Sequence, residues 1–418
     1  MHIGHLPLIL IWAVALASIL CMLVRPRSMP EAYWACGGAV LLMASGLIPL
    51  RQAAAAAMDG WDVYLFLTGM MILAELAQEQ KVFDWVADLA AHHARGSSAR
   101  LFLLVYCVGI AVTAFLSNDA TAVVLTPAVL AVVRRARVKP KPYLLACAFV
   151  ANAASFVFPI SNPANLVVFD RHVPPLASWL GIFLWPSIAS IAVTYFVLRW
   201  SAGDALSLRI HHRQDAAQLS PGGKLALAGL LFSAVALIVS SAFGVPLGTP
   251  TCAAAVVAMA AVAFKDRAVV QRVFRGVSWS VLPLVAGLFV IVEAMQNAGL
   301  LQLGLAALRA MAQLPVFAAK LIAAFAVAIA SNGMNNLPIG LMSGATIRHA
   351  QEAGIVAHAV LIGVDLGPNL SVTGSLATIL WLIALRRERV EITALEFFKV
   401  GLIAMPLALL ASLLVLWV

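Results

Sequence analysis

The residues Ser117-Asn118-Asp119 stand in the middle of an otherwise apolar stretch of sequence, residues 101–133. Asn335-Asn336 hold the same place in a second apolar stretch, residues 316–347. Each stretch is long enough for two short helices, and basic residues flank the first at both ends. We therefore predict two re-entrant hairpins with polar tips near the middle of a bilayer. Non-helical backbone at that depth needs protein or water around it.

The two hairpins belong to two copies of one unit. Trp61 precedes Glu75 with thirteen residues between them, and Trp279 precedes Glu293 with the same spacing, each pair upstream of a hairpin. An apolar chain that repeats a polar-interrupted unit is typical of transporters whose site lies where the copies meet. The predicted repeats are residues 1–215 and 216–418, with about five spans in each.

Composition defines the class of protein. Of 418 residues, 63% are apolar and only 11% are charged, and the mean hydropathy is +0.99. Apolar runs of about 20 residues recur along the chain, which is the length that crosses a bilayer as a helix. The sequence therefore predicts an all-α polytopic membrane protein. The five cysteines are scattered singly, without the spacing of a metal site, so no metal or cofactor is expected.

The basic residues predict the orientation. If the N-terminus is outside, 22 of the 27 lysines and arginines fall in inner loops or at inner span ends. This distribution obeys the positive-inside rule. Both termini are then predicted outside the inner membrane, and the second repeat is inverted relative to the first. The net charge of +9 is explained by topology, so nucleic acid is not an expected partner.

A helix-breaking segment is predicted in the span that follows each hairpin. The span 143–170 is interrupted at residues 159–165, and the span 356–385 at residues 365–375. Proline and glycine remove helical hydrogen bonds there, and small polar side chains can satisfy the freed groups or bind a ligand. Together with the hairpin tips, these breaks supply the predicted substrate-binding residues: Ser117, Asn118, Asn335, Asn336, Ser161, Asn162, Asn165, Thr373, Gly374 and Ser375.

Coupling to an ion gradient needs a group that changes charge. Acids at membrane depth are costly and are therefore candidates for function. The predicted proton carriers are Asp119 and Asp365, with Glu75 and Glu293 as further candidates. Two alternatives stay open: Asp119 could cap the returning half-helix that begins at Ala120, and the glutamates could lock the scaffold.

Three motifs resemble those of ArsB-type arsenite efflux permeases of the ion transporter superfamily. They are residues 117–127, 335–338 and 365–381, and the resemblance covers nearly the whole chain. It implies export of arsenite or antimonite as neutral hydroxides in exchange for protons, an elevator-type mechanism and, in some members, a soluble ATPase subunit. Asn369 departs from the family, which commonly has Lys there, and Ser371-Val372 replaces Thr-Pro.

The substrate-binding residues suit a neutral trihydroxide independently of that resemblance. Amides and hydroxyls both donate and accept hydrogen bonds, and the predicted breaks contain no Lys or Arg. The alternative is a sodium- or proton-coupled carrier of a dicarboxylate-like anion, or a sodium/proton antiporter. Helix N-termini and bound sodium could neutralise such an anion. An enzyme is not expected, because the chain has no HExxH motif. Association into a homodimer is left open.

Overall fold

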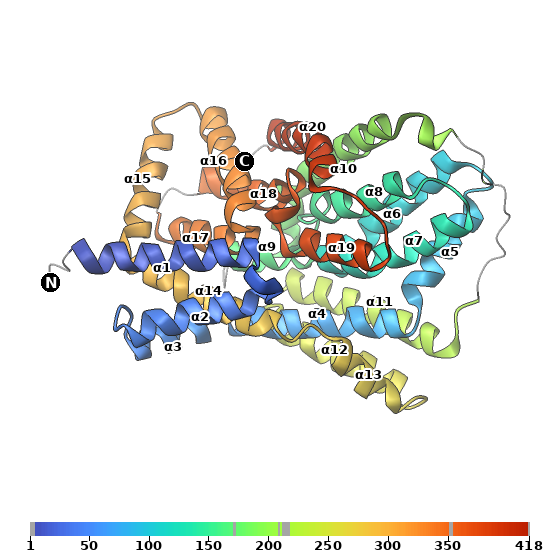
Figure 1. Cartoon of the computed structure of the whole chain (residues 1–418), viewed down its shortest axis with the longest axis horizontal. Coiled ribbons are helices and arrows are strands. Elements are labelled where there is room, and N and C mark those ends of the chain that lie inside the picture. Colours follow the sequence, from blue (N-terminus) through green and yellow to red (C-terminus); the bar gives the residue numbers. More distant parts are fainter. Residues whose placement is uncertain (1–4, 170–172, 208–209, 211–217, 351–353, 417–418) are drawn as a thin grey trace.

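The structure is a computed structural model that describes residues 5–169, 173–207, 210, 218–350 and 354–416. All regular elements in these ranges are helices (Figure 1). Seven helical segments of the described chain are long and apolar enough to cross a membrane. The pair α3 (Leu50–Asp59) and α4 (Trp61–Glu79), bent by 48°, would make an eighth. The predicted all-α polytopic class is confirmed.

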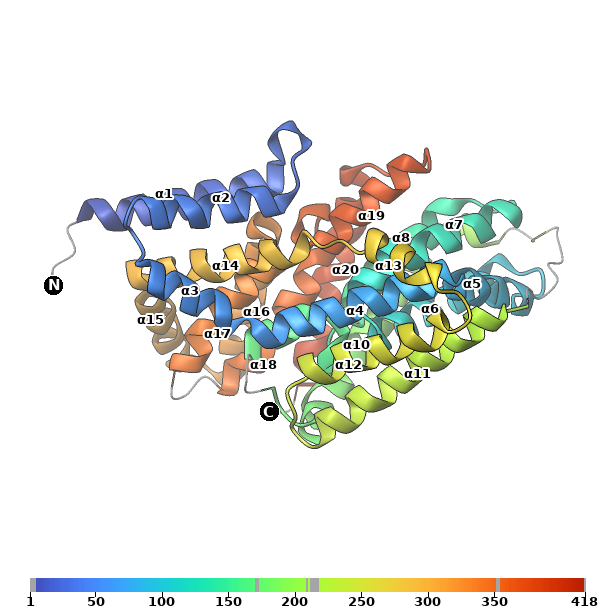
Figure 2. The ribbon, with the colours of Figure 1, turned by 90° about the horizontal axis from the view of Figure 1, so that it is seen from below.

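Two groups of helices form a scaffold, and their contacts cross between the halves of the chain. Helix α4 packs against α11 (Pro221–Ala242), α12 (Gly248–Ala263) and α13 (Ala268–Gly276). Helix α14 (Val281–Met295) packs in the same way against the N-terminal helices α1 (His5–Val24), α2 (Glu31–Ala44) and α3. Figure 2 shows α14 and α4 between the α1–α2 pair and the α11–α12 pair. The inversion of the halves stays a prediction.

The first hairpin comprises α6 (Ser98–Phe115), a π-helical turn η2 (Ala120–Leu125) and α7 (Thr126–Arg135). The hydroxyl of Tyr143, which lies shortly after α7, donates to the carbonyl of Ser98 over 3.0 Å. The chain therefore returns to the end at which α6 began. The second hairpin pairs α16 (Val316–Met334) with α17 (Asn336–His349). Because α6 and α16 are each long enough to cross a membrane, re-entry at half depth stays a prediction.

Both predicted breaks are present. Helix α8 (Pro140–Ala153) ends before a short 3-10 turn η3 (Pro159–Ser161), and the chain resumes as α9 (Pro163–Phe169). Helix α18 (Gly354–Leu366) likewise gives way to the turns η7 (Gly367–Asn369) and η8 (Val372–Gly374) before α19 (Leu376–Arg387). The prolines in these segments lack the N–H group that a continuous helix requires.

Four further helices complete the fold. Helices α10 (Leu176–Ala202) and α20 (Ala394–Leu414) pack against each other, and α10 also covers α8. Helices α5 (Val82–His93) and α15 (Leu301–Ala312) precede the two hairpins and pack against them. The polar segment from about Ser201 to Gly223 is expected to join the two repeats, and its residues 208–209 and 211–217 lie outside the described ranges.

Candidate functional site

The two breaks are joined by buried side-chain hydrogen bonds. The Asn162 amide nitrogen Nδ2 donates to Asp365 Oδ1 over 2.8 Å, linking residues 203 positions apart. Deeper in the same region, Asn152 Nδ2 donates to Asn369 Oδ1 over 3.0 Å, and Asn369 Nδ2 donates to the carbonyl of Phe149 over 3.1 Å. All four polar side chains are buried, with at most 2% of any of these residues exposed. The breaks therefore form one polar centre.

The first break owes its shape to two of its own amides. Asn162 Oδ1 accepts a hydrogen bond from the backbone N–H of Ala164, at the start of α9. Asn165 Nδ2 donates to the carbonyl of Ser155 over 2.9 Å and contacts two further carbonyls, those of Phe158 and Pro159, at 3.3 Å. These bonds satisfy carbonyls that the interruption removes from a helix, which is otherwise costly in a buried setting.

Asp365 is the buried acid of this centre. It is fully buried, and its Oδ2 atom has no hydrogen-bond partner among the described residues. Its hydrogen bond from the amide of Asn162 is neutral on the donor side. A buried carboxylate without a cationic partner is expensive, whereas a carboxylic acid is far less so. The side chain can therefore hold a proton in this position, and its role as a proton carrier stays a prediction.

The second hairpin is hydrogen-bonded to the second break through one residue, Asn332. Its Nδ2 donates to the carbonyl of Gly367 over 2.9 Å, and its Oδ1 accepts from the hydroxyl of Ser371 over 2.6 Å. Thr373 donates to the backbone carbonyl of Asn332 over 2.9 Å. Gly374 is required here, because a Cβ would lie 2.8 Å from Asn332 Oδ1 and 2.5 Å from Pro368 Cα. Tip and break thus form one unit.

The first hairpin meets the first break in a comparable way. The hydroxyl of Ser161 donates to the carbonyl of Ala114, near the end of α6, over 3.1 Å. At the tip, Ser117 Oγ accepts from the backbone N–H of Ala120 over 3.2 Å. The interpretation that Asp119 caps this returning helix is wrong, because its side chain makes no capping bond and Ser117 does. The Asp119 side chain is half-buried. Its role in coupling stays a prediction.

Of the remaining predicted residues at the tips and at the second break, some cap a helix and others are buried amides. Asn335 has a φ of 73°, and its side chain caps α17 by accepting from Leu337 N over 3.3 Å. Asn336 is buried beside it. The buried amide of Asn118 accepts from Asp119 N over 2.9 Å, and Ser375 caps α19. These side chains shape the tips and the start of a half-helix, and their contact with substrate stays a prediction.

Each returning helix also packs against the opposite break. Helix α17 lies on α9, and a Cβ on Gly344 would meet the carbonyl of Val168 at 2.6 Å. The turn η2 of the first hairpin lies on α19 and α8. The hairpins and the breaks therefore interlock.

Glu75 and Glu293 make their contacts within the scaffold. Glu293 Oε1 accepts from Gln52 Nε2 on α3 over 2.8 Å. The carboxyl of Glu75 packs on α13, so closely that a Cβ on Gly276 would lie 1.9 Å from Glu75 Oε1. Each glutamate thus reaches a helix in the other half of the chain. These contacts favour the scaffold interpretation over the coupling one.

Three asparagines of the centre were not predicted as site residues: Asn152, Asn332 and Asn369. Asn369 was noted only as a departure from a family pattern, and Asn332 stands beside the predicted tip. Asn152 lies in the apolar run of α8. A lone amide in an apolar helix that leads to a break is the signal that could have identified it, because an amide buried there requires a partner.

Comparison with known proteins identifies the family of this chain. Residues 7–367 match the family described as CitMHS, citrate transporter. The chain belongs to this family. Members of the CitMHS family are membrane transporters, and the protein is therefore a multi-span transporter. It is 28% identical to an arsenical pump membrane protein of Escherichia coli over 95% of both chains.

Two further proteins are similar over most of their length. A putative arsenical pump membrane protein of Bacillus subtilis is 24% identical, over 93% of this chain and 94% of that one. These relatives confirm the resemblance to arsenical pumps stated from the sequence motifs. The YdaH transporter of Alcanivorax borkumensis superposes with a TM-score of 0.57 and 16% identity, covering 90% of this chain and 89% of that one. At that identity the likeness supports the fold alone.

Proposed function

We propose that this CitMHS-family protein exports arsenite or antimonite, as neutral hydroxides, in exchange for protons across the inner membrane. The observation that carries the proposal is the buried Asn162–Asp365 hydrogen bond, which joins two broken helices through an amide and an acid. The names of the arsenical pump relatives support the cargo. The proposed orientation, with both termini outside, rests on the distribution of basic residues in the sequence.

The polar centre suits an uncharged cargo. The side-chain hydrogen bonds among its described residues involve amides, hydroxyls and one acid, and none of these bonds involves Lys or Arg. The buried lysine of α16, Lys320, donates to the carbonyl of Leu416 over 3.2 Å and stands about three turns before Asn332. A trihydroxide can both donate to and accept from such groups without charge compensation.

The second candidate is a carrier of citrate or a similar carboxylate, driven by protons or sodium. The description of the matching family favours it. Recognition of several carboxylates ordinarily uses basic side chains or bound cations. The second candidate therefore needs helix N-termini or sodium to supply the positive charge.

The contacts suggest which parts move. The hairpins and breaks interlock into one bundle, and the scaffold of α1–α4 with α11–α14 forms another. An elevator-type cycle would move the first against the second, with Asp365 exchanging its proton on each side. A soluble ATPase subunit and association of two copies remain proposals that rest on the resemblance.

Transport in proteoliposomes tests the proposal. Arsenite, antimonite and citrate are offered in parallel under an imposed pH gradient and, separately, a sodium gradient. We expect the pH gradient to drive arsenite and antimonite, and citrate to remain outside. Citrate movement without arsenite movement would establish the second candidate instead.

A further inference from the structure

A cavity of about 470 Å³ lies between the start of α8 and the end of α10. Its volume falls within the range of pockets that bind small molecules, roughly 300 to 1,000 Å³. The side formed by α8 carries two lysines, and the side formed by α10 carries mostly small residues. Lys139, Lys141 and Leu145 line the first side, and Leu198, Ser201 and Ala202 line the second.

The two lysines differ in how their charges are compensated. Lys141 Nζ donates to Glu396 Oε1, at the start of α20, over 2.7 Å. Lys139 is exposed and makes no hydrogen bond or ion pair with any residue that the structure describes. It stands at the N-terminal end of α8, where the helix dipole is also positive. An uncompensated positive charge beside a cavity favours an anionic ligand.

The cavity is apolar away from the lysines. Leu198 is buried and Leu145 is half-buried, and both line it. Ser201 and Ala202 follow Leu198 by three and four positions, so these three residues share one face of α10. The small side chains of Ser201 and Ala202 leave space between the helices. A ligand that fits this cavity therefore combines an anionic group with an apolar part.

Exposed aromatic residues mark the depth of the cavity. Trp200 is 71% exposed and Phe196 is 66% exposed, and both lie on the face of α10 opposite Leu198. Tryptophan is enriched where a membrane meets water. On the predicted orientation, Lys139 and Lys141 are on the inner side. The cavity then lies at the headgroup level of the inner leaflet, where phospholipids supply both an anionic group and an apolar part.

We propose that this cavity binds the phosphate of an anionic phospholipid, with Lys139 as the main charged contact and the two leucines against the apolar part of the lipid. Basic pockets between membrane helices on the inner side bind headgroups of this kind. The positive-inside rule accounts for lysines at this end of the helices, but it does not require a cavity beside them. Binding here does not depend on which cargo the protein carries.

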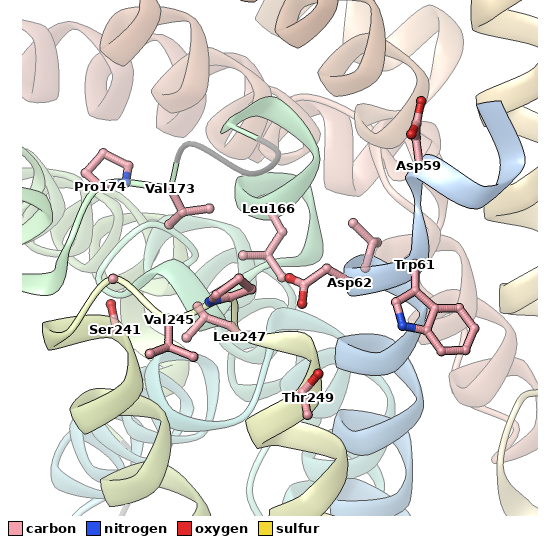
Figure 3. Close-up of a pocket in the computed structure, with 13 residues that line it drawn as sticks. Asp59, Trp61, Asp62, Leu166, Val173, Pro174, Ser241, Val245, Leu247 and Thr249 are labelled. Atoms are coloured by element: carbon pink, nitrogen blue, oxygen red, sulfur yellow. The ribbon is translucent and has the colours of Figure 1, made fainter. Parts of the chain in front are cut away.

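A second cavity, of about 380 Å³, carries acidic groups instead (Figure 3). It lies at the α3–α4 bend and is lined by Asp59 and Asp62. Figure 3 shows both carboxyl groups, with that of Asp62 beside Leu166 of α9. Because carboxylates disfavour a phosphate, we expect the lipid to bind between α8 and α10 rather than at this bend.

The test is binding of phosphatidylglycerol to the detergent-solubilised whole chain, measured by native mass spectrometry. Lys139→Gln is compared with Lys265→Gln, a control that removes the charge of another exposed lysine, which is also placed on the inner side but does not line the cavity. We expect Lys139→Gln to weaken binding about fivefold, the change expected for one lysine near an anionic headgroup. Lys265→Gln should bind like the wild type. Unchanged binding in Lys139→Gln, or equal weakening in both variants, would overturn the site.

Ala205→Phe tests the cavity itself. Ala205 lines the cavity from the turn η5 (Gly203–Leu206) that follows α10, and it is half-buried. A phenyl ring there fills the space and leaves both lysines in place. We expect binding of phosphatidylglycerol to weaken at least fivefold, while the thermal midpoint without lipid stays that of the wild type. Full binding by this variant would show that the lipid contacts only the outer surface and would refute the cavity as its site.

Two further ligands separate a lipid from a soluble anion. Phosphatidylcholine, whose headgroup has no net charge, should bind more weakly than phosphatidylglycerol, and Lys139→Gln should reduce that difference. Inorganic phosphate should not displace phosphatidylglycerol beyond the effect of chloride at the same ionic strength. Displacement by inorganic phosphate would assign the cavity to a soluble anion, and equal binding of the two lipids would exclude recognition of charge.

Discussion

At the scale of single residues, Asn152 and Asn369 join the two broken helices by a buried hydrogen bond. Each loses a buried hydrogen bond when the other is removed. We expect Asn152→Ala and Asn369→Ala each to lower the free energy of unfolding by about 0.5 to 2 kcal/mol. The double variant should lose less unfolding free energy than the two single variants together, because both substitutions break the same hydrogen bond. Reversible unfolding in mixed micelles measures this cycle, and strict additivity would contradict the pairing.

Glu293 shows how a single substitution separates coupling from packing. Glu293→Gln keeps an oxygen that can accept from Gln52 and removes only the charge. If the residue locks the scaffold, this variant should keep pH-driven flux, while Glu293→Ala should lose about 1 kcal/mol of stability. Glu75→Gln serves as the matched variant in the other half. A coupling role for Glu293 would instead appear as loss of pH-driven flux in Glu293→Gln.

At the scale of elements, an ion pair links α5 to the first hairpin. It joins Asp88 of α5 to Arg135 of α7. Burial raises the pKa of the Asp88 carboxyl above its ordinary value, although Arg135 opposes the shift. Without Arg135 the pKa should rise further. A group with a raised folded pKa contributes stability at low pH that is lost as pH rises through that pKa.

Arg135→Ala should therefore lose stability relative to the wild type as pH rises above the ordinary range of a carboxyl. Thermal midpoints in detergent across pH check this, with Asp88→Asn/Arg135→Ala as the control that removes the titrating group. A difference between Arg135→Ala and wild type that does not change with pH would contradict the assignment to Asp88.

The same scale shows what sequence patterns can and cannot predict. The breaks at residues 159–165 and 365–375 followed from proline and glycine, whose effects on a helix are local. The bond between Asn162 and Asp365 could not follow, because it joins positions 203 apart and depends on how the helices pack. Ser117 and Asp119 are both common caps, so local sequence alone could not tell which one caps the returning helix.

At the scale of the whole molecule, the interlocked hairpins and breaks explain why polar backbone can be buried in so apolar a chain. Asn332, Ser161, Asn162 and Asn165 satisfy the carbonyls and amides that the interruptions free. In lipid, unsatisfied backbone groups would cost several kcal/mol each. The scaffold contacts that cross between the halves form a second group of helices, and in the proposed elevator-type cycle the bundle would move against it.

The central claim is that a proton on Asp365 is exchanged for a neutral hydroxide at the junction of the two breaks. The most direct test is arsenite flux in proteoliposomes for wild type and Asp365→Asn, with and without a pH gradient. The substituted amide can still accept from Asn162, so the fold and exchange of arsenite at equal pH should survive. We predict that a pH gradient accelerates flux in the wild type and has no effect in Asp365→Asn. Equal acceleration of both proteins by the gradient would contradict the account.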